Sequence, residues 1–315
     1  MQLKFLWLSA CGLFGLVAAA ADIRAVWDHS GKGLYAGDWP RTMTALKGAR
    51  VTDLYLNVGG VDFAHYASAT LPKSLTYKKF GDHLTAALQA AQPEGIRVHA
   101  WFICFNATRN APATMNFFLK KGWRLRSATG GYTTYLDPAN AGVRARVLLA
   151  IDELVSYPVD GVQLDFVRYG DSTVKPAHAA EVIASFVAEA RRHVKRPKTL
   201  SAAVYGKYPA SIVSVGQDWP RWLDLDLIDY AVPMNYTDKP NKFKELLATQ
   251  MSPSRRAKRT IIGIGVTATG LHLSPWQVVE QARLARRGGF AGVALFDLDL
   301  TLERSILPAL KRDGW

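Results

Sequence analysis

The sequence predicts a single (β/α)8 barrel, the TIM-barrel fold of the α/β class. Eight apolar runs rich in β-branched and aromatic residues recur along the 315 residues, and segments with helical apolar spacing separate them. This alternation favours parallel strands joined by helical crossovers. The length and the hydrophobic fraction of 49% suit one barrel of ordinary size. No linker or low-complexity tract divides the chain, which indicates one domain.

The predicted strands share a short apolar core with polar or turn residues at its ends. In chain order they cover residues 23–29, 54–58, 98–105, 161–169, 200–205, 227–236, 260–267 and 292–298. An open, doubly wound sheet is the alternative. That fold would have a Gly-rich fingerprint after its first strand, and the turn at residues 28–33 lacks the required spacing.

Helices are predicted where apolar residues recur three and four positions apart. Examples cover residues 39–47, 80–91, 143–155, 177–193, 243–251 and 275–287. Asn140 can cap the third of these helices, and Ser274 with Pro275 is typical of the start of the last one. Gly288 and Gly289 predict where that last helix ends.

Residues 1–21 have the pattern of a secretory signal peptide: Lys4, an apolar run and a small-residue end at Ala19–Ala21. The run is too short for a comfortable membrane span, which needs about 20 apolar residues. We therefore expect cleavage after Ala21, a barrel over residues 22–315, and a secreted or periplasmic protein without a transmembrane span. Lipid anchoring through Cys11, which ends a lipobox-like sequence, is the alternative.

The chain is strongly basic, with a formal net charge of +13 that falls to +12 when Lys4 is removed. Such a surface favours a polyanionic partner, for example an anionic glycan, although solubility alone also explains it. No nucleic-acid recognition motif is present. The single remaining cysteine, Cys104, lies among apolar residues and is interpreted as a buried small hydrophobe.

The fourth predicted strand ends in Asp165, Arg168 and Tyr169. A carboxylate at the end of a buried strand needs a partner, because its unpaired burial costs several kcal/mol. Catalytic residues of parallel barrels gather at the C-terminal ends of the strands. Asp165 is therefore the leading catalytic candidate, and a structural ion pair with Arg168 is the alternative.

Several segments resemble the glycosyl hydrolase-like family 10 of bacterial TIM-barrel proteins. The most distinctive are residues 135–138 (YLDP) and 159–169 (VDGVQLDFVRY). Residues 33–39, 64–68, 71–72, 95–101, 217–219, 228–236 and 292–296 complete the resemblance across nearly the whole chain after residue 21. Gly170 departs from it, since the family commonly has Pro there. The resemblance implies a glycosidase that acts on bacterial glycans, including cell-wall glycan strands.

Glycoside hydrolysis generally requires two carboxyl groups that flank the scissile bond. The acids near the predicted strand ends are all aspartates: Asp28, Asp62, Asp137, Asp165, Asp297 and Asp299. We predict Asp165 as the catalytic centre. Asp297 and Asp28, at the ends of the eighth and first strands, are the two candidates for its partner.

The remaining site candidates are polar or aromatic residues near strand ends. Arg168, Tyr169, Asn235, Tyr236, His99, Trp101 and Asp137 are predicted substrate contacts. Structural alternatives remain open: barrel filling for His99 and Trp101, a loop cap for Asn235, and a turn for Asp137. No paired histidine spacing is present, so no metal or other cofactor is predicted.

These observations predict a secreted glycoside hydrolase that cleaves O-glycosidic bonds in a bacterial polysaccharide, of which peptidoglycan glycan strands are one example. A non-catalytic glycan-binding barrel that has lost one carboxylate is the alternative. A polysaccharide deacetylase would require a metal-bound water, and the missing ligand set argues against it.

Overall fold

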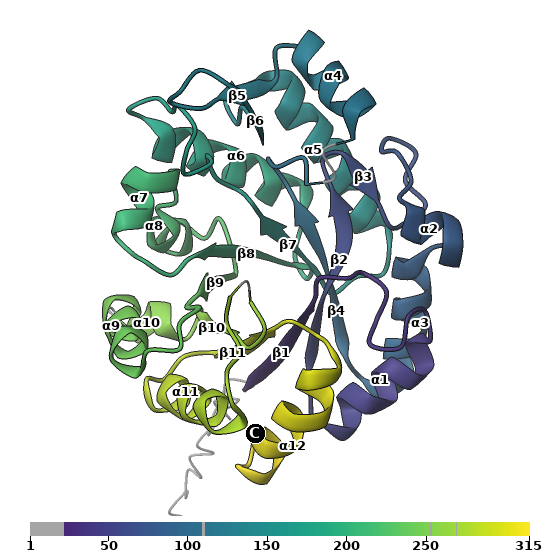
Figure 1. Ribbon diagram of the computed structural model, residues 1–315, viewed down its shortest axis with the longest axis vertical. Coiled ribbons are helices and arrows are strands. Elements are labelled where there is room, and N and C mark those ends of the chain that lie inside the picture. The colour runs from purple at the N-terminus through teal and green to yellow at the C-terminus, as the bar shows by residue number, and fades with distance from the viewer. Residues whose placement is uncertain (1–21, 109–110, 252–253, 269) are drawn as a thin grey trace, which may run out of the picture.

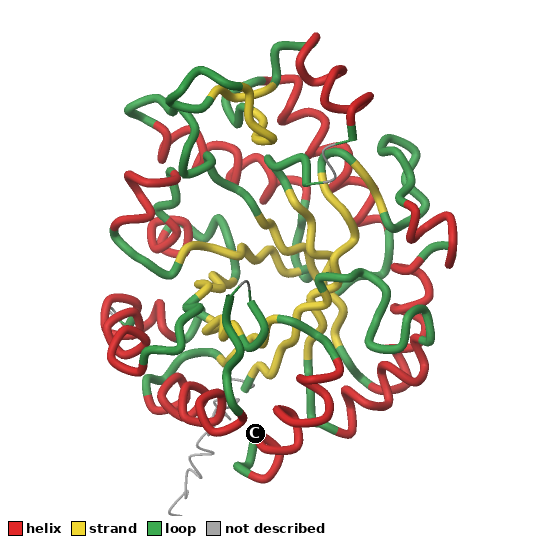
Figure 2. Tube along the Cα trace, in the orientation of Figure 1, coloured by secondary structure: helices red, strands yellow, loops and turns green. Residues whose placement is uncertain are grey.

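The computed structural model describes residues 22–108, 111–251, 254–268 and 270–315. Eight parallel strands form its centre, and helices surround them (Figures 1 and 2). The predicted signal peptide at residues 1–21, including Cys11, lies outside the described residues. None of the helices in the described part of the chain is long and apolar enough to cross a membrane.

Every predicted barrel strand is confirmed. In order around the barrel, the strands are β1 (Ile23–Asp28), β2 (Asp53–Gly60), β4 (Arg97–Ile103), β7 (Gly161–Asp165), β8 (Thr199–Tyr205), β9 (Tyr230–Met234), β10 (Ile261–Gly265) and β11 (Gly292–Phe296). Strand β1 pairs in parallel with both β2 and β11, so the sheet is closed. This closure confirms the barrel and excludes the open doubly wound sheet.

The outer layer contains helices of very different length. They are α1 (Trp39–Gly48), α2 (Leu75–Phe80), α3 (His83–Glu94), α4 (Pro112–Lys120), α5 (Ala141–Ser156), α6 (Ala179–His193), α7 (Ala210–Val215), α8 (Trp219–Asp224), α9 (Pro240–Gln250), α10 (Ser254–Ala257), α11 (Pro275–Arg287), a π-helical turn (Leu302–Ile306) and α12 (Leu307–Arg312). The Asn140 side chain caps α5, and Ser274 forms a capping box at the start of α11.

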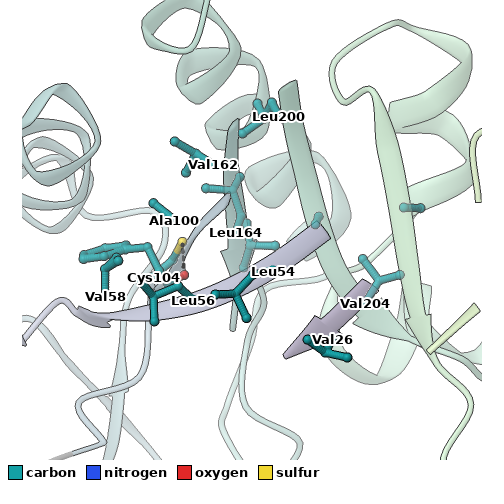
Figure 3. Packing of buried hydrophobic residues seen from close by; sticks show 14 of the residues in the cluster. Val26, Leu54, Leu56, Val58, Ala100, Cys104, Val162, Leu164, Leu200 and Val204 are labelled. Atoms are coloured by element: carbon teal, nitrogen blue, oxygen red, sulfur yellow. Dashed lines mark hydrogen bonds between the residues drawn. The ribbon is translucent and has the colours of Figure 1, made fainter. Parts of the chain in front are cut away.

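Side chains along each strand point alternately outward and inward, so the core consists of an outer layer and a barrel interior. Outward-facing residues such as Leu54, Leu56, Val162 and Leu164 form the layer between strands and helices (Figure 3). Cys104 belongs to this layer, where its burial raises the pKa of the thiol well above its ordinary value. The cysteine is therefore a small buried hydrophobe, as predicted.

Inward-facing residues include Ala25, Trp27, Tyr55, Trp101 and Ala203, which fill the barrel interior.

Three short strands lie outside the barrel. Strand β3 (Phe63–Ala64) pairs antiparallel with the end of β2. Strands β5 (Arg124–Arg126) and β6 (Tyr132–Leu136) form a hairpin, seen near the top of Figure 1. Single bridges join Asn106 to Tyr135 and Ser127 to Thr173, so the hairpin is attached to the loops that follow β4 and β7.

Candidate active site

A pocket of about 530 Å³ opens at the C-terminal ends of the barrel strands. Strands β1, β4, β7, β8, β9 and β11 contribute to its walls, as expected for the catalytic end of such a barrel. Its lining residues are Trp27, His29, Trp101, Ile103, Thr108, Asp165, Phe166, Arg168, Ala203, Met234, Tyr236, Ala268, Leu271 and Phe296. The pocket is mainly apolar with few polar groups, which is typical of ligand sites.

A second cavity of about 530 Å³ lies between α3 and residues 157–160. The carboxylate in its wall belongs to Asp160, which precedes β7. Asp160 accepts a hydrogen bond of 2.8 Å from the Val98 amide. Because that carboxylate holds the start of β4, we place no chemistry in this cavity.

Asp165 is the last residue of β7 and is buried at the pocket. The Trp101 indole donates a hydrogen bond of 3.0 Å to its Oδ2, and the Phe166 amide donates one of 2.6 Å to its Oδ1. Arg168 Nη1 lies 3.6 Å from Oδ1. Burial raises the pKa of Asp165, whereas Arg168 and the two hydrogen bonds act in the opposite direction. The predicted ion pair with Arg168 is thus present, within a site that faces a pocket.

Phe166 follows Asp165 with a φ of +48°, which is unusual for a residue with a side chain. Such a conformation costs on the order of 1–3 kcal/mol. At this turn the chain leaves β7, the Phe166 amide reaches the Asp165 carboxylate, and the Phe166 ring joins the pocket wall.

Asp297 follows β11 and lies beside His29, at the edge of the pocket. Its Oδ1 accepts hydrogen bonds from the amides of His29 (3.0 Å) and Leu298 (2.7 Å). Its Oδ2 lies 3.9 Å from His29 Nδ1. Burial, with a further contribution from Asp28, raises the pKa of Asp297 to about 7. Asp297 itself does not line the pocket, but His29 does.

Asp28 is completely buried at the end of β1. Its carboxylate accepts hydrogen bonds from the Ser30 hydroxyl (2.6 Å) and from the amides of Gly31 (3.1 Å) and Gly33 (2.7 Å). These contacts fix the loop that carries His29. The Asp28 carboxylate thus contacts this loop, and Asp28 is not among the residues that line the pocket.

Trp101 and Tyr236, two predicted substrate contacts, both line the pocket. The Tyr236 ring stacks on Phe296 with centroids 5.6 Å apart. Burial raises the pKa of Tyr236 well above its ordinary value, and the nearby acids Asp165 and Asp297 add to the effect. The Tyr236 hydroxyl thus stays protonated and can donate a hydrogen bond.

Four other predicted contacts are engaged elsewhere. His99, predicted as a substrate contact with barrel filling as the alternative, faces the barrel interior near its N-terminal end and is hydrogen-bonded to Asp53 (2.8 Å). The Asn235 amide group is paired with the Gln250 amide group through two hydrogen bonds of 2.9 Å. Tyr169 is buried, and its hydroxyl lies 3.5 Å from Asp137 Oδ1. We leave these four residues out of the proposed site.

The sequence did not single out His29, Phe166 or Phe296, which all line the pocket. Their position just after or at the end of a strand is the signal that could have identified them. In the described part of the chain, no group of three or more His, Cys, Asp or Glu residues is placed to hold a metal ion.

Residues 44–270 match a protein family with the description "Putative glycosyl hydrolase domain". The chain belongs to this family. The match covers β2 to β10 and includes Asp165, Arg168 and Tyr236, whereas His29 and Asp297 lie outside it. No curated protein matches the chain in sequence. The narrower resemblance to glycosyl hydrolase-like family 10 stays a prediction.

Solved structures of two glycoside hydrolases and of a chitinase-like agglutinin share the fold of this chain. The PgaB (BpsB) glycoside hydrolase domain from Bordetella bronchiseptica has a TM-score of 0.70 at 16% identity, covering 92% of this chain and 98% of that chain. A GH18 chitinase from Cycas revoluta has a TM-score of 0.59 at 12% identity, covering 93% and 99%. A chitinase-like agglutinin from Robinia pseudoacacia has a TM-score of 0.58 at 12% identity, covering 92% and 99%. These similarities confirm the barrel fold.

Proposed function

We propose that this protein is a glycoside hydrolase that cleaves O-glycosidic bonds of a bacterial polysaccharide in the pocket at Asp165. The observation that carries the proposal is a buried carboxylate at a barrel strand end, inside a pocket with aromatic walls. Trp27, Trp101, Tyr236 and Phe296 offer flat apolar surfaces on which sugar rings can stack. Membership in the glycosyl hydrolase family supports this chemistry.

We assign different roles to the two carboxyl groups. Burial raises the pKa of Asp165, but Arg168 and the N–H hydrogen bonds on both carboxylate oxygens oppose this rise and favour the ionised form. In the described residues, Oδ2 of Asp297 accepts no hydrogen bond, so it can carry a proton at neutral pH. Asp297 then protonates the leaving oxygen, and Asp165 activates water or attacks the anomeric carbon.

Two substitutions test these roles in the full chain. Asp165→Asn and Asp297→Asn keep the shape of each side chain but remove its charge and its transferable proton. General acid–base assistance is worth about 10²–10⁴-fold, so each variant should lose at least about 100-fold in the cleavage rate of purified bacterial glycans. Mass analysis of the products measures this loss.

Asp152→Asn on the outer helix α5 is the matched control, and it should retain full activity. Thermal unfolding establishes that the variants are folded. Full activity in a folded Asp165→Asn variant would remove Asp165 from the catalytic centre. Failure of that variant to fold would instead favour a structural ion pair with Arg168.

A glycan-binding barrel without catalysis is the second candidate. It is favoured by one observation: within the described residues, Asp165 is the single carboxylate that lines the pocket. Such a protein would bind glycans and release no products, and Asp165→Asn would change its affinity rather than a rate. Calorimetry together with product analysis separates the two candidates.

We propose peptidoglycan glycan strands among the substrates to be tested, and export through residues 1–21 as the route to them. Lys4 and the apolar run that follows support export. The basic charge supports an anionic polymer, because exposed Lys and Arg side chains attract it over distances of about 10 Å at 0.1 M salt.

A further inference from the structure

Arg168 is a buried cation in the wall of the proposed active site. Its side chain lines the pocket, and the residue is 5% exposed. Within the described part of the chain, its Nε and Nη1 atoms have no hydrogen-bond partner. Buried guanidinium N–H groups are rarely left unpaired, because their lost hydration is not replaced.

Asp165 satisfies this cation incompletely. The distance of 3.6 Å between Arg168 Nη1 and Asp165 Oδ1 allows electrostatic attraction but exceeds the length of a hydrogen bond. Both Asp165 oxygens already accept shorter bonds from Trp101 and Phe166. The guanidinium therefore retains donor capacity toward another acceptor.

Aromatic rings fix the guanidinium in place. Its central carbon lies 4.0 Å from the centroid of the Phe166 ring and 4.7 Å from that of Tyr205. The Tyr135 hydroxyl lies beside it as well. Asp171 is an exposed acid, and it accepts a hydrogen bond from the Tyr205 hydroxyl. A cation held in this way is preorganised for a ligand in its own plane.

We propose that Arg168 binds a carboxylate of the substrate, and hence that the enzyme prefers glycans with acidic sugar units. A carboxylate is planar, carries the complementary charge and accepts charge-assisted N–H hydrogen bonds from a guanidinium. This inference rests on the proposed function, since it places the acidic sugar beside the catalytic Asp165.

Two sources of such a carboxylate are distinguishable. A hexuronate has it on the sugar ring, whereas N-acetylmuramic acid has it on a lactyl ether. The probes are a hexuronate tetrasaccharide and a tetrasaccharide of alternating N-acetylglucosamine and N-acetylmuramic acid. Each is compared with its own carboxyl-reduced form, which has the same size and linkage without the charge.

Calorimetry with the unaltered protein should show at least tenfold tighter binding for one acidic probe than for its reduced form, as expected for about one charged hydrogen-bonded pair. Arg168→Met should abolish this preference, so that the acidic probe and its reduced form bind equally. Arg168→Lys should retain part of this preference, because the positive charge remains but the planar guanidinium is lost. Arg192→Met on the outer helix α6 removes an exposed charge and should retain the whole preference.

Equal binding of both acidic probes and their reduced forms overturns the inference. A preference that survives in folded Arg168→Met overturns it too, because other basic residues then cause it. If Arg168→Met does not fold, the same comparison of acidic and reduced probes is made between Arg168→Lys and the unaltered protein. A preference that is undiminished in Arg168→Lys then overturns the inference. Binding is measured separately from cleavage: discrimination without products contradicts the hydrolase, whereas cleavage without discrimination contradicts the role of Arg168.

Discussion

Two aspartates near the pocket differ in their surroundings and therefore in their chemistry. Asp165 receives N–H donors on both oxygens and faces Arg168. Asp297 receives two backbone amides on one oxygen, and burial with the nearby Asp28 raises its pKa to about 7. Environments that differ in this way commonly separate the acid from the base in an active site.

The pKa of Asp297 predicts the pH dependence of cleavage. In its proposed role as the general acid, Asp297 must be protonated, so kcat/KM should fall as the pH rises through about 7. Rates of glycan cleavage measured from pH 5 to 9 should show this fall in kcat/KM. The residual activity of Asp297→Asn should not show the fall. A profile that rises through the same range would make Asp297 the base instead.

Residue chemistry was only partly predictable from the sequence. Asp165, Arg168, Trp101 and Tyr236 line one pocket, because each lies near or just after the C-terminal end of its strand. The same reasoning selected Asp28, but its carboxylate oxygens accept hydrogen bonds from the loop that follows it. Strand position alone does not reveal which hydrogen bonds a side chain already makes.

His29 shows the opposite failure. It is an exposed residue after the first strand, and its amide contact is to Asp297, 268 positions later in the chain. No local pattern joins two such residues. Only closure of the barrel, which pairs β1 with β11, brings them together.

At the scale of elements, the barrel strands were predictable because buried parallel strands are continuous apolar runs. The β5–β6 hairpin was not, because its residues are mostly half-exposed and follow neither a clear strand nor a clear helix pattern. Tertiary bridges to the loops after β4 and β7 attach it to the barrel. His99 was grouped with the substrate contacts for a related reason. Periodicity identifies the face of the strand on which a residue lies, but not the end of the barrel to which it is nearer.

Asp53 links the starts of β2 and β4 at the end opposite the pocket. It accepts hydrogen bonds from Arg97 (2.7 Å to each oxygen) and His99 (2.8 Å). Burial alone would raise the pKa of Asp53, but the bonds from His99 and Arg97 outweigh burial and hold it well below its usual range. Asp53→Asn should therefore reduce the free energy of unfolding at pH 7 by about 3–5 kcal/mol.

The sign of this effect gives its pH dependence. A carboxyl group with a lowered pKa in the folded state stabilises the protein above its unfolded pKa of about 3.9, and this contribution is lost as the pH falls below it. Denaturant unfolding at several pH values should show the difference between parent and Asp53→Asn shrinking in acid. Asp152→Asn, which removes an exposed pair with His193, should cost less than about 1 kcal/mol. A difference that stays constant down to pH 3 would contradict the assignment.

At the scale of the whole molecule, the barrel separates stability from chemistry. The Asp53–His99 network lies at the N-terminal end of the strands, and the pocket with Asp165 lies at the C-terminal end. Loop substitutions around the pocket can therefore alter the substrate without disturbing the closed sheet, which is the usual behaviour of this fold. The fold alone does not determine the reaction, which depends on the groups in the pocket.

We propose that the bond cleavage at Asp165 is hydrolysis. The most direct measurement is cleavage of the preferred glycan in water labelled with heavy oxygen, followed by mass analysis of the products. Hydrolysis places one labelled oxygen at each new reducing end with the unaltered protein, and Asp165→Asn should release at least about 100-fold less product. Unlabelled products with an unsaturated sugar, or a glycan that binds and is never cut, would contradict it.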